Sequence, residues 1–237
     1  MRRLSEVTGW VLLGGAITGG LYWGFLNTPE SSLLALVESA ILALLTLAYA
    51  AITINGALLA WSSGVGRGLF REALGGLPFF VAALGMTVVA WWLAGAAATW
   101  VTLNSGPINA WFIASAGWAD ASPFFTGVTW ITAWIRWVAG PLVALALLAS
   151  LIGEGWGSIA RVTWLRAAFS PRRLALGTLW FGALVAVPWI YAVPWRPRGL
   201  PATWVEIAFI GTKLFLCAVV MATGVALMVR TAGAPKR

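Results

Sequence analysis

Four ionisable side chains lie inside long apolar stretches of this chain: Glu38, Arg136, Glu206 and Lys213. A charge at the centre of a bilayer costs at least about 2.5 to 3.5 kcal/mol on insertion scales, so each is expected to have a partner or a water. Two are acids and two are bases, which favours pairing between helices. Such a cluster could couple proton or ion movement, or it could only hold the helices in register.

Further polar side chains share helical faces with this intramembrane charge cluster: Thr129, Thr132, Tyr49 and Thr53. The spacing predicts that the faces converge, with Arg136 between the two carboxylates. Lys213 follows Glu206 by seven residues, which places them on one face about 10 Å apart along the helix axis. We therefore expect Lys213 to donate to Glu206 directly or through water.

The chain contains 17 tryptophans, and five of them lie well inside apolar stretches. These deep tryptophans are Trp91, Trp92, Trp134, Trp137 and Trp189. The spacing places Trp130, Trp134 and Trp137 on one helical face. Packing or lipid contact is the simpler interpretation, and the alternative is an aromatic wall for a bound lipid, quinone or carotenoid.

Several kinds of chemistry are excluded by composition. The chain has no histidine, which removes the usual ligand of haem, pigments and catalytic metals in membrane helices. One cysteine, Cys217, rules out an internal disulfide, and a single aspartate, Asp120, leaves no catalytic triad or metal cluster. We expect no enzyme activity, no metal site and no resident cofactor.

The composition predicts an all-α, polytopic membrane protein. Hydrophobic residues make up 61% of the chain and charged residues 9%, against about 25% charged in soluble domains. Backbone polar groups must be paired in lipid, and the apolar runs exceed the length of barrel strands, so they predict helices in one transmembrane domain over 1–237. The predicted spans are 8–26, 32–62, 78–103, 124–152, 173–193 and 203–230.

Basic residues are distributed unevenly about these spans. Eleven Lys and Arg fall on the side of the termini and two, Arg196 and Arg198, on the other. The positive-inside rule then places both termini in the cytoplasm of a cell whose inner membrane holds the chain. Because the charge lies in short loops, anionic lipid headgroups are the expected partners, and nucleic acid is not.

Two connecting segments carry a structural prediction. The stretch RGLFREALGGLP at 67–78 has an apolar arc opposite Arg71 and Glu72, which predicts an interfacial amphipathic helix before the third span. The segment 104–123 is too short and polar to cross, yet it carries Trp111, Phe112 and Trp118. It is predicted to be either an interfacial helix or a re-entrant hairpin.

Two resemblances concern the last spans. A lysine in the final span resembles the Schiff-base lysine of microbial retinal proteins, but Phe209 stands where that family has a carboxylate, and six spans are found, so no retinal is expected. The stretches RRLALGTLWFGALVAVP and KLFLCAVVMATGVALMVR are similar to the last helices of copper-resistance D-type membrane proteins. They lack that family's histidines, so copper handling does not follow.

Two functions remain. The first is a non-catalytic membrane subunit of a larger complex, because polar residues are scarce in the spans and glycines such as Gly14 and Gly15 permit close helix contact. The second is a small transporter or permease that uses the intramembrane charge cluster for proton or ion coupling.

Overall fold

The described part of the protein, residues 1–28, 32–195 and 203–233 of a computed structural model, is helical and contains no strand. Six helices are long and apolar enough to cross a membrane, as in a multi-pass membrane protein. They are α1 (Arg2–Asn27), α2 (Leu33–Ser63), α4 (Leu77–Leu103), Ser122–Glu154, Pro171–Ala192 and α11 (Thr203–Ala232). The prediction of six long apolar helices is confirmed. Glu30, Arg196, Arg198, Lys236 and Arg237 lie outside the described residues.

Two of the six helices contain π-helical turns ahead of a proline. Ser122–Glu154 consists of α6 (Ser122–Trp134), η1 (Ile135–Ala139) and α7 (Gly140–Glu154), with Pro141 in the first turn of α7. Pro171–Ala192 consists of α10 (Pro171–Phe181), η2 (Gly182–Ala186) and η3 (Pro188–Ala192). A proline lacks the N–H that an α-helix needs and its ring crowds the carbonyl four residues earlier, so a wider turn accommodates it.

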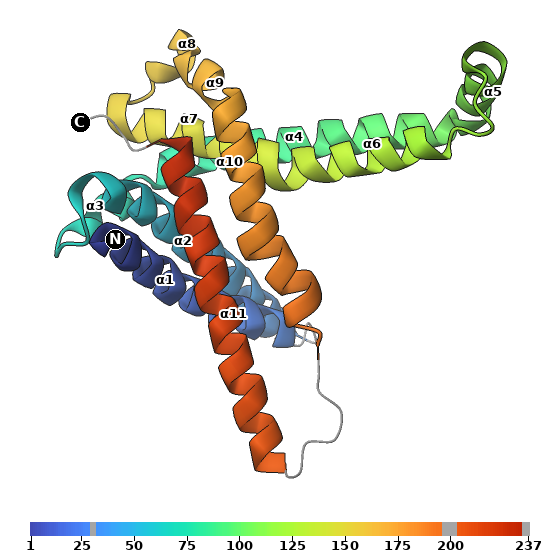
Figure 1. The fold of residues 1–237 in the computed structure, drawn as a ribbon. Coiled ribbons are helices and arrows are strands. Elements are labelled where there is room, and N and C mark those ends of the chain that lie inside the picture. The colour runs from blue at the N-terminus through green and yellow to red at the C-terminus, as the bar shows by residue number, and fades with distance from the viewer. Residues whose placement is uncertain (29–31, 196–202, 234–237) are drawn as a thin grey trace.

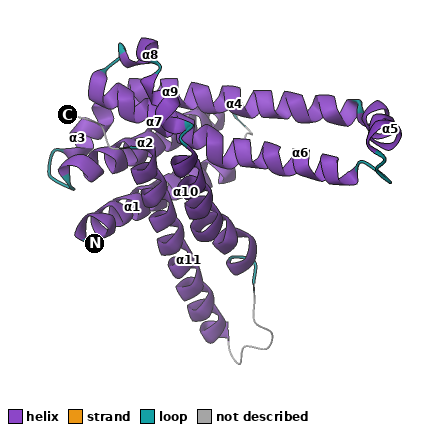
Figure 2. Cartoon of the chain, turned by 45° about the horizontal axis from the view of Figure 1, so that its top comes forward, coloured by secondary structure: helices purple, strands orange, loops and turns teal. Residues whose placement is uncertain are grey.

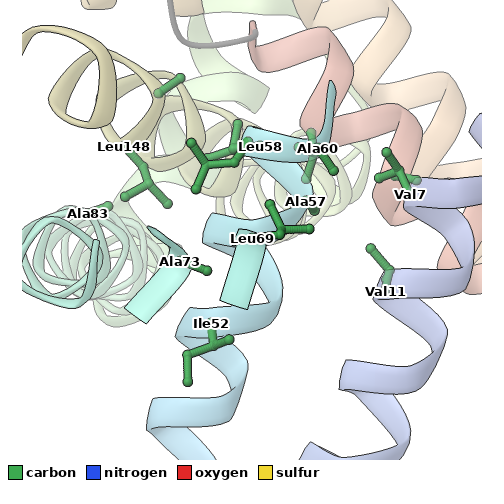
Figure 3. Packing of buried hydrophobic residues seen from close by; sticks show 14 of the residues in the cluster. Val7, Val11, Ile52, Ala57, Leu58, Ala60, Leu69, Ala73, Ala83 and Leu148 are labelled. Atoms are coloured by element: carbon green, nitrogen blue, oxygen red, sulfur yellow. The ribbon is translucent and has the colours of Figure 1, made fainter. Parts of the chain in front are cut away.

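The long helices form three hairpins that meet at one end and diverge at the other. The hairpins are α1 with α2, α4 with α6, and α10 with α11, and the pair α4 and α6 extends as a free-standing arm (Figures 1 and 2). Buried residues concentrate where the hairpins meet: α2 is buried mainly between Ala51 and Ala60, and α11 from Cys217 onward. Side chains of α1, α2, α3, α4 and α7 interlock in this core (Figure 3).

The short helix α3 (Leu69–Gly75) occupies the position predicted for an amphipathic helix. Its Leu69 and Ala73 are buried against α2, and the side-chain amide of Asn55 donates to the Ala73 carbonyl at 3.0 Å. Phe70 and Leu74 stay exposed. The helix was therefore predicted correctly, but only part of its apolar arc is left to face a membrane surface.

The polar segment after α4 forms one helix, α5 (Ser105–Ala116), at the tip of the α4–α6 arm (Figure 1). It ends at Gly117, whose φ of 66° is the left-handed conformation that glycine adopts without strain. None of its side chains is buried. The segment thus contains one helix, and its position relative to a membrane stays a prediction.

Arginine side chains bind helix carbonyls where the hairpins meet. The Arg3 guanidinium donates to the Trp61 carbonyl at 2.9 Å, near the end of α2, and that of Arg173 donates to the Ala232 carbonyl at 3.0 Å, the last of α11. Arg230 lies over the Trp61 ring, 5.2 Å from its centroid. Cations favour helix C-termini, where carbonyls lack intrahelical donors. The predicted basic side is thus one region of the fold, which also holds α8 (Ser158–Arg161) and α9 (Thr163–Ala168).

Candidate functional site

The four intramembrane charges do not assemble into one cluster, so this part of the sequence prediction is wrong. Among the described residues, ion pairs form between Arg2 and Glu6 at 3.0 Å and between Arg161 and Glu154 at 3.2 Å, away from the cluster residues. Glu38 and Glu206 are exposed. They lie in the first two turns of α2 and α11, toward the ends at which the hairpins diverge, which keeps their carboxylates away from Arg136.

Lys213 forms a cap across the α10–α11 hairpin. Its ammonium donates to the carbonyl of Val193, the C-cap residue of η3, at 3.0 Å and to that of Trp195, two residues later, at 2.6 Å. The last carbonyls of a helix have no intrahelical donor, and the helix dipole places partial negative charge there. An ammonium group carries three N–H donors and a positive charge, so it can pair with these carbonyls and offset the partial negative charge. Its partner is therefore the end of the neighbouring helix and not the Glu206 carboxylate.

The backbone of Arg136 is exceptional because of Pro141. The Gly140 N–H donates to the Ile135 carbonyl in the π-turn, so it does not serve the Arg136 carbonyl. The next backbone nitrogen is that of Pro141, which carries no hydrogen. The indole N–H of Trp91 on α4 supplies the missing donor, at 2.8 Å. An interhelical side-chain bond thus satisfies a carbonyl that the proline leaves without a partner.

The guanidinium of Arg136 lies on α4 between Trp91 and Gly95. Its central carbon is 5.6 Å from the Trp91 ring centroid, and a Cβ added to Gly95 would come within 2.6 Å of one terminal nitrogen. The guanidinium forms no hydrogen bond or ion pair with the residues that the structure describes, and its Nε is buried without a partner. Among the residues that the structure describes, the Trp91 ring is thus the one group that stabilises the Arg136 cation.

This guanidinium borders an open groove along α4, which we call the α4 groove. The other lining residues are Trp91, Trp92, Gly95, Ala96, Thr99, Trp100 and Leu103. The lining residues between Trp92 and Trp100 are Gly95, Ala96 and Thr99, which are all small. The α4 groove was not predicted from the sequence, although the run of small residues at 94–99 was the available signal.

The predicted polar stripe also separates. Thr53 is buried against α1: its carbonyl accepts from the Trp10 indole at 2.9 Å, and Gly14 packs on its side chain. Tyr49 is half-buried on the same part of α2. Thr129 is exposed and bonds within its own helix to the Phe125 carbonyl, and Thr132 is half-buried. Thr53 and Thr129 thus serve local helix contacts.

The deep tryptophans do not form one wall. Trp134 donates to the Thr178 hydroxyl at 2.9 Å, whereas Trp137 packs edge-on against Trp91 at a centroid distance of 4.9 Å. Trp92, Trp130 and Trp189 are exposed. Because η1 begins after Trp134, the turn between Trp134 and Trp137 is wider than the α-helical spacing assumes.

One apolar cavity of about 280 Å³ lies between α2, α4, α7, η2 and α11. Trp137 and Phe181 form part of its wall, with Ile54, Phe80, Met228 and other apolar side chains. Thr87 contributes the one hydroxyl. Of the predicted aromatic contacts, Trp137 is the residue that reaches this cavity, whose lining suits an acyl chain or another apolar group.

Searches against protein-family models, curated proteins and solved structures find no match to this chain.

Proposed function

We propose that this chain is a non-catalytic integral membrane subunit of a larger membrane assembly. The observation that carries the proposal is the divergence of the three hairpins. Away from the shared core, α4 is packed against little other than α6, and its Trp92, Trp100 and Leu103 are 69%, 62% and 79% exposed. Membrane helices associate through close packing and interhelical polar contacts, and the free halves of these hairpins are open to such contacts from other chains.

A transporter is less well supported. Coupling through a Glu/Arg/Lys cluster needs groups that exchange protons or ions with one another, whereas Lys213 is bonded to two carbonyls and Arg136 lies on an aromatic ring. The cavity between the helices is apolar, which offers little to solvate a polar substrate. An acyl chain, quinone or carotenoid is the class of ligand that this lining accepts.

Both termini are proposed to face the cytoplasm of the cell that carries the chain in its inner membrane. The support is that Arg3, Arg173 and Arg230 lie at the end of the fold where the hairpins meet. The loops at that end also carry the excess of basic residues. Anionic headgroups of the cytoplasmic leaflet are the proposed lipid contacts there.

The proposal is tested by gentle solubilisation of native membranes that contain a C-terminally tagged chain at its natural level. Native mass spectrometry of the purified material is expected to give a mass above that of one chain, with defined partner proteins in fixed stoichiometry. Absorbance spectra of the same sample report any bound pigment or quinone. A monodisperse, stable single chain without protein partners would refute the proposed role.

A further inference from the structure

The α4 groove carries an inference that rests on the proposed subunit role and specifies the partner. We infer that the α4 groove receives a transmembrane helix of another protein, and that this helix presents an aspartate or glutamate to Arg136. The groove joins a cation that has no ion pair within the described part of the chain to a helix surface of small side chains. A partner helix with an acidic side chain would pair with the cation and pack against the small side chains.

The charge of Arg136 lies some distance from the end of α4. Gly95 lies eight residues before the end of α4, about 12 Å along the axis, and α4 is about 40 Å long, against about 30 Å of hydrocarbon. With α4 aligned with the bilayer normal and centred in the bilayer, the guanidinium that covers Gly95 lies several ångströms inside the hydrocarbon region. It points back toward Trp91, one turn further from that end of α4, so it does not reach the nearer interface. A carboxylate at the same depth would supply the missing ion pair and hydrogen bonds.

The α4 groove also has small side chains that suit close helix packing. Ala96 and Thr99 are exposed on the groove, one turn apart, and beside them Gly95 carries no side chain. Small residues at this spacing let a second helix approach the backbone closely, which is how helices gain packing energy in lipid. Trp92 and Trp100 border the same groove and can cover the sides of a helix seated there.

Other sources of a carboxylate or phosphate fit less well. A bilayer lipid holds its charged group at the interface and directs its chains inward, so at the depth of Arg136 it presents methylene groups. A second copy of this chain offers Glu38 and Glu206, which lie in the first two turns of helices of 31 and 30 residues and hence close to headgroup depth. A partner helix that carries its carboxylate at the depth of Arg136 has neither restriction.

The test uses a synthetic transmembrane peptide of leucine and alanine, without tryptophan, that carries a dansyl group and one glutamate eight residues from its end. A matched peptide has glutamine at that position. The protein is reconstituted in phosphatidylcholine vesicles, and energy transfer from its own tryptophans to dansyl measures association. The glutamate peptide is expected to bind the wild-type chain about tenfold more tightly than the glutamine peptide.

Variants locate the site. Arg136→Gln is expected to remove the preference for glutamate, whereas Arg172→Gln, which removes an exposed cation at the start of α10, should keep it. Ala96→Phe fills the groove without removing charge and is expected to weaken both peptides. Ala97→Phe, also exposed on α4 but outside the groove lining, is the matched control.

Three results would overturn the inference: equal binding of the two peptides, displacement of the glutamate peptide by oleate at low mole fraction, which would assign the groove to a lipid anion, and Arg136-dependent association between copies of the chain. The outcome is separate from that of the subunit proposal. A native assembly that survives Ala96→Phe, together with peptides that bind equally, would remove the inference and leave the subunit role standing.

Discussion

Trp91 and Arg136 are joined twice: the indole N–H donates to the Arg136 carbonyl at 2.8 Å, and the Arg136 guanidinium lies over the same indole at 5.6 Å from its centroid. The first contact satisfies the backbone of η1 and the second stabilises a cation in the membrane region. Together the two contacts join α4 to the helix Ser122–Glu154 at the base of the arm. At the same place η1 also contacts α10.

Trp91→Phe keeps an aromatic face but removes the donor to the Arg136 carbonyl. A carbonyl left without a partner away from water costs about 1–3 kcal/mol, so we expect the free energy of unfolding to fall by about that amount. Unfolding in mixed micelles of dodecyl sulfate and a mild detergent, followed by circular dichroism, measures it. Trp92→Phe is the control, since Trp92 is 69% exposed, and should change the value by less than about 0.5 kcal/mol.

Pro141→Ala tests why that donor is needed. The substitution restores a backbone N–H at position 141, which can serve the carbonyl that the π-turn leaves free. We therefore expect Trp91→Phe to cost less in this background than in the wild type, with a coupling energy of at least about 0.5 kcal/mol in a double-mutant cycle. Additive costs would show that the proline is not the reason for the Trp91 contact.

Lys213→Met removes the ammonium that caps the end of η3 while keeping a similar length of chain. Two carbonyls lose a charged donor, and we expect a loss of about 1.5–3 kcal/mol in the free energy of unfolding in detergent micelles. Glu206→Gln should leave that quantity within about 0.5 kcal/mol, because Glu206 is exposed and forms no ion pair with Lys213. Equal losses in the two variants would restore the predicted Glu206–Lys213 pair.

Gly14 and Gly15 are neighbours with opposite surroundings. A Cβ at Gly14 would overlap the Thr53 side chain, whereas at Gly15 it would meet nothing within 4 Å. We expect Gly14→Ala to destabilise the chain by about 1–3 kcal/mol through overpacking, and Gly15→Ala to be neutral or to stabilise it by up to about 1 kcal/mol. The same micelle unfolding assay compares them. Similar effects would argue against close packing of α1 on α2.

The side of the membrane is open to direct labelling. In a Cys217→Ala background, single cysteines replacing Ser5 in α1 and Thr231 in α11 should be labelled from the same side by an impermeant maleimide, because six crossings separate them. A cysteine replacing exposed Ser115 in α5 should react from the other side. Reaction of the two terminal positions from inside the cell is the result expected from the basic loops.

Much of this fold follows from sequence because lipid allows few alternatives. Long apolar runs must form helices when no water can pair with the backbone, so the six spans and their approximate ends were predictable, and the helix at 69–75 followed from its amphipathic pattern. The prolines at 141 and 188 were visible too, but the π-turns ahead of them depend on how the local backbone relaxes.

The sequence by itself thus determined the class of protein, its helices, its unequal distribution of basic charge, and the presence of four ionisable groups inside the spans. Only the tertiary structure decided their partners, because helical periodicity gives the face of a residue and not the direction in which the helix leaves the core. The divergence of the hairpins separates Glu38 and Glu206 from Arg136. The chain that follows η3 lies beside α11, where Lys213 donates to two of its carbonyls. Complementary charge in one sequence does not imply pairing when backbone carbonyls and aromatic faces lie closer.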